Sequence, residues 1–196
     1  MMLWECWLRT PTANKGDHSK SIPNALKNHI PVYSCLEVSE MYEGVKALSE
    51  KRKYMIGHFK VTPLSVYHNV ENYSYLIEHD DIGKFVLCTD AVGFPYKIPM
   101  LSHILIEANY SSDLIIDHLC DNEDIRSHNE YHMEIEETIK AIRRNYSPDL
   151  VNVIICHLSY SQSNEEMFKR KIFDDLGVRT VVAEKGLNIN INKDIF

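Results

Sequence analysis

The chain has 196 residues, of which 44% are hydrophobic and 25% are charged, and this composition is typical of one soluble globular domain with a sizeable core. Its formal net charge of −7 disfavours broad binding to nucleic-acid phosphates, because that mode needs clustered Lys and Arg. Long nucleic acid is therefore a disfavoured partner, whereas a nucleotide held by a metal remains compatible with the charge.

The N-terminal segment is unusual. Residues 1–10 contain both tryptophans, Trp4 and Trp7, and show no strand alternation. The segment is too short and carries the wrong flanks for a signal peptide or a membrane span. None of the five cysteines forms a Cys-x-x-Cys pair, and Cys88 and Cys156 lie in apolar runs where a free thiol behaves as a small hydrophobe. These patterns predict a reducing, cytoplasmic compartment and no membrane partner.

Short helices and a strand are predicted near the start of the chain. Residues 19–28 have the pattern of a short helix, residues 30–35 that of a strand, and residues 38–50 that of a second helix. The basic residues 51–53 that follow read as a solvated turn.

An antiparallel meander is predicted next. Residues 54–66, 73–78 and 84–89 alternate apolar and polar side chains, and residues 80–83 have the composition of a hairpin turn. Half-buried strands show this alternation because successive side chains point to opposite faces of a sheet.

The second half of the chain alternates apolar runs with helical segments. Strands are predicted at residues 103–108, 151–156, 178–183 and 187–191, and helices at residues 112–121 and 130–145. A further helix should begin after Asn164, whose side chain is a good N-cap, and end at Gly177.

Residues of the kind that bind metals stand at the ends of these apolar runs. His68, Asp90 and His157 follow residues 61–67, 84–89 and 151–156, and Asp17 and His18 lie in an earlier Gly-Asp-His-Ser segment. Strand ends are where a scaffold can direct several side chains to one point. The spacing predicts one metal centre assembled from distant segments.

This arrangement resembles the metallo-β-lactamase-fold hydrolases. Their ligands come from a His-x-His-x-Asp-His loop, a later His, a Thr-Asp or Ser-Asp strand end and a final strand-end His, and Thr89-Asp90 and His157 match the last two. The resemblance covers residues 16–191 and implies an α/β fold, an incomplete αββα sandwich that lacks much of its N-terminal sheet. Residues 1–15 would be an atypical N-terminal segment and residues 16–196 the metallo-β-lactamase-like domain.

The resemblance also implies a reduced metal site. Ala13 and Lys15 stand where the family has its first two histidines, and neither side chain replaces a neutral imidazole at neutral pH. The first metal would keep only His68 and Asp90. The second would keep all its ligands, namely Asp17, His18, Asp90 and His157. One Zn or Mn ion is therefore expected rather than two, and a protein without metal is the remaining alternative.

Two residues are candidates for proton transfer and catalysis. His132-Met133 resembles the His-Met-Ser/Thr segment of phosphodiesterase-type and tRNA-maturation-type relatives, in which that His assists proton transfer, and Asp17 is the second catalytic candidate. Glu107-Ala-Asn-Tyr resembles a strand end of the family and implies a supporting or structural position. Each residue also has an ordinary structural alternative, such as a helix cap, a turn or a satisfied core histidine.

Three hypotheses for function follow. The first is a divergent metal-dependent hydrolase of the phosphodiesterase class, acting on a small phosphodiester or nucleotide. The second is a non-catalytic descendant that binds a nucleotide or a protein, for example a phage or mobile-element protein that inhibits host defence. The third is a truncated product in which Trp4 and Trp7 cover a sheet edge, or mediate a homodimer or another protein contact. Metal content separates the first hypothesis from the other two.

Overall fold

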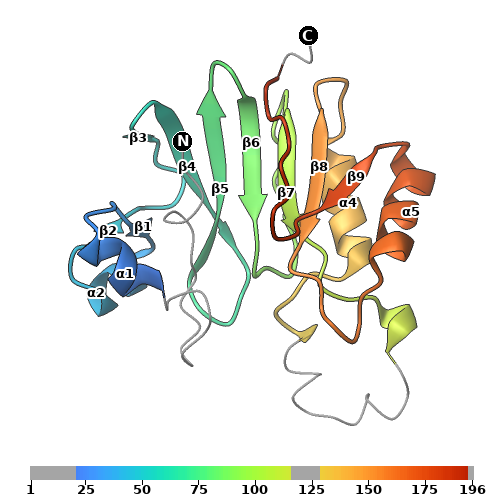
Figure 1. Ribbon diagram of the computed structural model, residues 1–196, viewed down its shortest axis with the longest axis horizontal. Helices are drawn as coiled ribbons and strands as arrows, with labels where there is room; N and C mark the ends of the chain where they lie inside the picture. The colour runs from blue at the N-terminus through green and yellow to red at the C-terminus, as the bar shows by residue number, and fades with distance from the viewer. Residues whose placement is uncertain (1–20, 116–128, 194–196) are drawn as a thin grey trace.

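A seven-stranded mixed sheet, in the order β3-β4-β5-β6-β7-β8-β9, forms the centre of the fold (Figure 1). The computed structural model describes residues 21–115 and 129–193. The expectations for the N-terminal segment 1–15, and for Asp17 and His18, lie outside these residues and stay predictions.

The first four strands form the predicted antiparallel meander, except that a turn at Gly57 and His58 divides the single strand expected over residues 54–66 into two. They are β3 (Tyr54–Ile56), β4 (Phe59–Val66), β5 (Asn72–His79) and β6 (Gly83–Cys88). Gly83 closes the hairpin between β5 and β6 with φ 67, a conformation that L side chains rarely adopt. A Cβ at this position would also meet Ser102 Oγ at 2.3 Å, so the turn requires glycine.

The remaining strands, β7 (His103–Glu107), β8 (Asn152–Cys156) and β9 (Thr180–Val182), continue the sheet in parallel from β6. Parallel neighbours need crossovers, and these contain α4 (Ile135–Asn145) and α5 (Glu165–Leu176). The carboxyl ends of β6, β7, β8 and β9 consequently meet at one edge of the sheet, which is where open α/β sheets place their sites.

The main core lies between the sheet and these two helices. Buried residues of the strands, such as Val86, Ile104 and Ile155, pack against Ile142 of α4 and Phe168 of α5. The helices show the required apolar stripe, and both predicted caps of α5 are confirmed. Asn164 Oδ1 accepts a hydrogen bond from Met167 N at 2.9 Å, and Gly177 adopts φ 67.

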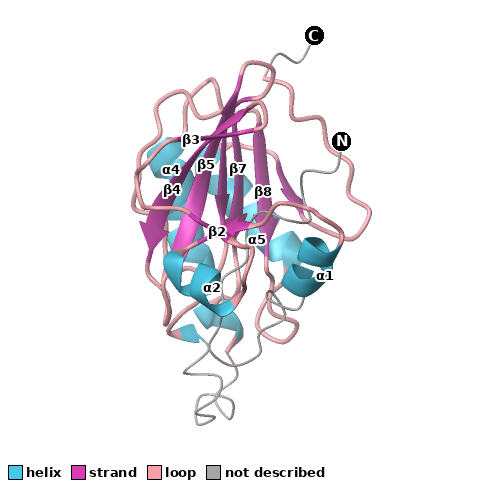
Figure 2. Cartoon of the chain, turned by 90° about the vertical axis from the view of Figure 1, so that its left-hand side faces the viewer, coloured by secondary structure: helices cyan, strands magenta, loops and turns pink. Residues whose placement is uncertain are grey.

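A small unit of helices and strands lies beside β3 and β4, at the opposite end of the sheet from α4 and α5 (Figure 1). It contains α1 (Ile22–Lys27), α2 (Leu36–Met41) and the parallel pair of β1 (Tyr33–Ser34) and β2 (Lys46–Ala47). Figure 2, which views the molecule from this side, shows the strands of the large sheet fanned out by their twist.

The predicted helix at residues 38–50 is wrong beyond Met41, and the strand at residues 30–35 is shorter than expected. After α2, Gly44 turns the chain with φ 96, and Lys46 and Ala47 pair with Tyr33 and Ser34. Val32 and Val45 are buried with Val38 in the core of this unit. Burial of these apolar side chains from both segments outweighs the local helical pattern.

Three further predictions need correction. The helix expected over residues 130–145 begins only at Ile135. Before it, the Met133 carbonyl accepts a hydrogen bond from the backbone N–H group of the loop residue Asn109, which follows β7. Ser112–Leu114 form a 3₁₀ turn, η2, where a longer helix over 112–121 was expected, and residues 116–121 lie outside the described part. Residues 187–191 form no strand. Instead this segment bonds to the sheet through Asn190 O, which accepts from Asn152 Nδ2 at 2.8 Å.

None of the helices in the described part of the chain has the length and apolar character of a membrane span.

Candidate metal centre

Three polar side chains stand at the carboxyl ends of neighbouring parallel strands. Asp90 follows β6, Glu107 is the last residue of β7, and His157 follows β8 directly. Asp90 and His157 both have positive φ, 54° and 60°, which is uncommon for residues other than glycine and concentrates at functional sites. The strand ends therefore direct these three side chains to one region.

His132, from the extended segment before α4, completes a cluster with Asp90 and His157. One ligand atom from each of the three residues lies within 4.8 Å of the other two. His157 Nε2 is 3.6 Å from Asp90 Oδ1, and the His132 and His157 ring centroids are 5.0 Å apart. Two imidazoles and a carboxylate are a donor set that Zn²⁺ and Mn²⁺ accept.

Glu107 lies beneath this cluster and is completely buried. Its Oε1 atom accepts hydrogen bonds from Nδ1 of His132 at 2.5 Å and of His157 at 3.0 Å, and Oε2 accepts from Ala91 N at 3.0 Å. Burial raises the pKa of Glu107, but the two histidine hydrogen bonds outweigh it and hold the pKa below its ordinary value. The carboxylate is thus the charged form.

The charge on Glu107 decides which histidine nitrogens carry protons. A carboxylate only accepts hydrogen bonds, so Nδ1 of His132 and of His157 must each donate. The Nε2 atom of each neutral ring then presents a lone pair, which is the form that binds metals. Burial lowers the pKa of His157, but Glu107 and Asp90 outweigh that effect and raise it, so a proton competes with any metal at its Nε2 atom.

His68 lies beside the cluster, with its ring centroid 5.6 Å from that of His132. Its Nδ1 atom donates to Tyr131 O at 3.0 Å, and burial lowers its pKa, so the ring is neutral. Its buried Nε2 atom has no hydrogen-bond partner among the described residues. A buried imidazole lone pair without a partner is costly unless a ligand such as a metal occupies it.

Hydrogen bonds to backbone carbonyls hold the loops that carry the cluster. Asn72 Nδ2 donates to the carbonyls of Thr89 and Asp90, and Asn109 Nδ2 donates to His157 O at 2.8 Å. These amide groups stabilise the left-handed backbone conformation of Asp90 and His157, because they satisfy carbonyl oxygens that are not hydrogen-bonded to a neighbouring strand.

The segment that carries His132 is held in the same way. The backbone N–H groups of Asn109 and Ile135 donate to Met133 O and Tyr110 O at 2.8 and 2.9 Å. The loop after β7 therefore lies along the segment before α4, which brings His132 onto Glu107.

Of the residues predicted as ligands, Asp90 and His157 lie together and His68 lies next to them; their role as metal ligands stays a prediction. His132, expected as a proton-transfer residue, is part of the same cluster. The sequence indicated Glu107 only as a supporting residue, whereas the structure places it in contact with two of the cluster's histidines. A glutamate that closes an otherwise apolar strand is the sequence signal that could have indicated this contact, since such a residue is rarely buried without partners.

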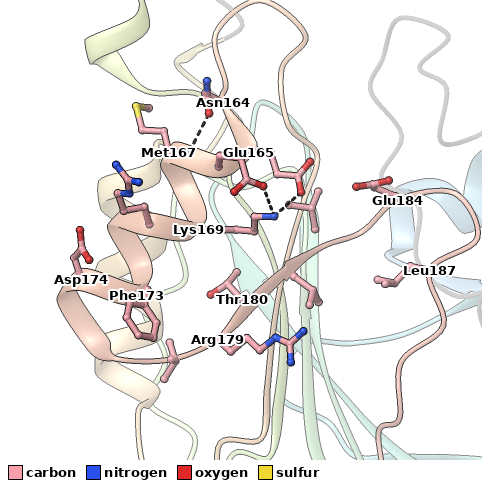
Figure 3. Close-up of a pocket in the computed structure, with 15 residues that line it drawn as sticks. Asn164, Glu165, Met167, Lys169, Phe173, Asp174, Arg179, Thr180, Glu184 and Leu187 are labelled. Atoms are coloured by element: carbon pink, nitrogen blue, oxygen red, sulfur yellow. Dashed lines mark hydrogen bonds and ion pairs between the residues drawn. The ribbon is translucent and has the colours of Figure 1, made fainter.

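A separate groove of about 850 Å³ runs between α5 and β9 (Figure 3). Its walls combine apolar side chains such as Phe173 and Leu187 with charged ones, and Lys169 pairs there with Glu165 and Glu166 at 2.8 and 2.6 Å. None of the clustered residues lines this groove. It is therefore a distinct feature of the surface.

Comparison with known proteins supports the fold through structure alone. No family model matches the sequence, and neither does any curated protein. The metallo-β-lactamase fold protein YhfI from Bacillus subtilis superposes with a TM-score of 0.67 at 16% identity, over 92% of this chain and 75% of YhfI. The chain therefore has the metallo-β-lactamase fold.

Enzymes with different substrates share this fold with the chain. A diphosphatase from the PhnP family superposes with a TM-score of 0.54 at 15% identity, covering 87% of this chain and 65% of the enzyme. An isothiocyanate hydrolase from Delia radicum gut bacteria gives 0.56 at 11% identity, covering 91% and 75%. Because one fold serves such different substrates, function must be argued from the site.

Proposed function

We propose that this protein is a metal-dependent hydrolase of the phosphodiesterase class that acts on small phosphodiesters with one Zn or Mn ion. The observation that carries the proposal is the convergence of Asp90, His132 and His157 over the buried carboxylate of Glu107. The buried Nε2 atom of His68 beside them, which has no hydrogen-bond partner within residues 21–115 and 129–193, supports it. We assign the ion to Asp90 and His157, with Asp17 and His18 as the further ligands expected from sequence and His68 beside this site.

A bound divalent ion would supply Lewis acidity, neutralising charge on phosphate oxygens and promoting ionisation of water at neutral pH. Hydrolysis adds water across a P–O ester bond, and the leaving alkoxide must receive a proton. His132 is suited to this transfer: Glu107 holds its Nδ1–H group, so Nε2 is the nitrogen that can take up a proton from the attacking water and pass it to the leaving oxygen. Glu107 also orients His157 through its Nδ1 atom.

Metal analysis and turnover of bis(p-nitrophenyl) phosphate test this proposal together. The variants Asp90→Asn and His157→Asn remove a ligand, while asparagine tolerates the left-handed backbone that both positions require. We expect the parent to bind about one equivalent of metal and to hydrolyse the diester slowly, and each variant to lose both properties. A parent that binds no metal would sink the proposal and favour the non-catalytic binding protein.

His132→Gln separates proton transfer from metal binding. We expect it to retain metal and to lose roughly 10²–10⁴-fold in kcat toward a diester with an alkoxide leaving group, such as 3′,5′-cyclic AMP, the range that a positioned general acid contributes. Turnover of bis(p-nitrophenyl) phosphate should change little, because its phenolate leaves without a proton. Loss of metal from this variant would instead make His132 a ligand.

A further inference from the structure

A ladder of aromatic rings leads from the histidine cluster to the protein surface. The rings of His157, His132, His68, Tyr131 and Tyr67 follow one another, with centroid separations of 5.0, 5.6, 5.9 and 6.5 Å. The inner end lies at the candidate metal centre. The outer end is Tyr67, which is 69% exposed.

The outer pair has the geometry of a stacking platform. Tyr67 and Tyr131 lie at an interplanar angle of 27°, within the offset-stacked range of aromatic pairs. Tyr131 meets the edge of His68 at 87° and accepts its Nδ1 hydrogen bond through the backbone carbonyl. Tyr131 is thereby held in place, and it supports one side of the exposed Tyr67 ring.

Tyr67 is also fixed at its backbone. It follows β4 directly, and its carbonyl accepts from Val92 N at 3.2 Å, which ties it to the loop that carries Asp90. A rigid exposed ring loses little conformational freedom when a ligand stacks on it. The net charge of −7 gives phosphates little long-range attraction, whereas stacking on Tyr67 would not depend on charge.

We infer that Tyr67, supported by Tyr131, is a stacking subsite for a planar ring attached to the phosphate, which makes nucleotides the preferred class of ligand. The inference rests on the proposed function for the position of the phosphate at the cluster. Stacking of a base on an aromatic side chain tolerates any base, because every base has a π-face. The subsite should therefore select for a base and discriminate weakly among bases.

Binding measurements test the subsite without requiring turnover. Isothermal titration of the full chain, supplied with Zn²⁺, compares 5′-AMP with ribose 5-phosphate, which has the phosphate and sugar without the base. We expect AMP to bind about ten-fold more tightly, as one base stacked on one aromatic ring predicts. Tyr67→Ser should bring the ratio of the two dissociation constants close to one, and Tyr67→Phe should keep it.

Tyr146→Ser is the matched control, because Tyr146 is also exposed, at 54%, and lies at the far end of α4 from His132. It should retain the parent's ratio. Equal affinity of the parent for the two ligands, no binding of either, or an unchanged ratio in Tyr67→Ser would overturn the inference. The parent could bind AMP more tightly than ribose 5-phosphate, and Tyr67→Ser could remove this difference, while the parent hydrolyses no diester. That result would support the subsite and remove only the catalytic proposal.

Discussion

At the scale of single residues, one buried carboxylate organises the candidate metal centre. Glu107 contacts two histidines and a backbone N–H group, so none of the four groups can change without affecting the others. Its negative charge selects the tautomer in which Nε2 of each histidine faces the cluster. The ligand geometry therefore depends on a residue that need not touch the metal.

Glu107→Gln should weaken metal binding by roughly 10–100-fold, the range found when partners of metal-ligating histidines are removed. The amide has nearly the same shape, but its NH₂ group, if placed toward the histidines, cannot accept from their Nδ1–H groups. The rings would turn to the other tautomer and present Nε2–H to the site. Competition with a chromogenic chelator measures the affinity, and circular dichroism should show an unchanged fold. The exposed Glu43→Gln serves as control, and a metal affinity equal to the parent's in Glu107→Gln would refute the tautomer argument.

At the scale of elements, α4 is joined to the end of β7 near its start and to the loop after β6 at its end. Near its start Thr138 Oγ1 donates to Glu107 O at 2.7 Å, and at its end Asn145 is buried against the loop after β6. Asn145 Oδ1 accepts from Ile98 N at 2.7 Å, and its Nδ2 atom donates to Tyr96 O at 3.0 Å. Helix α4 thus fixes the end of β7 and the loop after β6 as well as covering the core.

Asn145→Ala should lower the free energy of unfolding by about 1–3 kcal/mol, because it leaves two half-buried backbone groups of that loop without partners. Urea unfolding followed by circular dichroism measures the loss. Asn192→Ala, at an exposed position, should stay within about 0.5 kcal/mol of the parent. Equal stability of Asn145→Ala and the parent would mean that water replaces both hydrogen bonds.

At the scale of the whole molecule, buried histidines link stability to pH. His103 begins β7 and is fully buried, with Nδ1 3.0 Å from Asn152 Nδ2, and burial lowers its pKa from the ordinary value of 6.5. Below about pH 6.5, His103 is therefore protonated in the unfolded chain but stays neutral in the folded chain until the pH is lower. The stability associated with His103 is present above this pH and is lost as the pH falls.

His103→Gln should make the loss of stability between pH 7.5 and pH 5 shallower than in the parent, whatever its cost at neutral pH. The free energy of unfolding in urea at several pH values gives the slope. His58→Gln alters an exposed ring and should leave the slope as it is. His68 acts in the same direction as His103 and His157 in the opposite one, so the comparison must be made between variants. A parental slope in His103→Gln would show that this ring does not contribute.

The sequence by itself determined those features that depend on neighbouring residues. The meander from Tyr54 to Cys88, the parallel strands β7 and β8 and both ends of α5 follow from alternation, apolar runs and capping chemistry, which act over a few positions. Asp90 and His157 were also visible, because each closes an apolar strand.

Only the tertiary structure decided which polar groups share a site. Glu107 contacts His132 and His157 across 25 and 50 positions of sequence. No local sequence pattern predicts a contact between residues so far apart. The same holds for the segment over residues 38–50, where burial of Val32, Val38 and Val45 together overrides the helical pattern, and for His132, which the loop after β7 draws out of the expected helix. In each case long-range burial or hydrogen bonding outweighs propensities worth less than about 1 kcal/mol per residue.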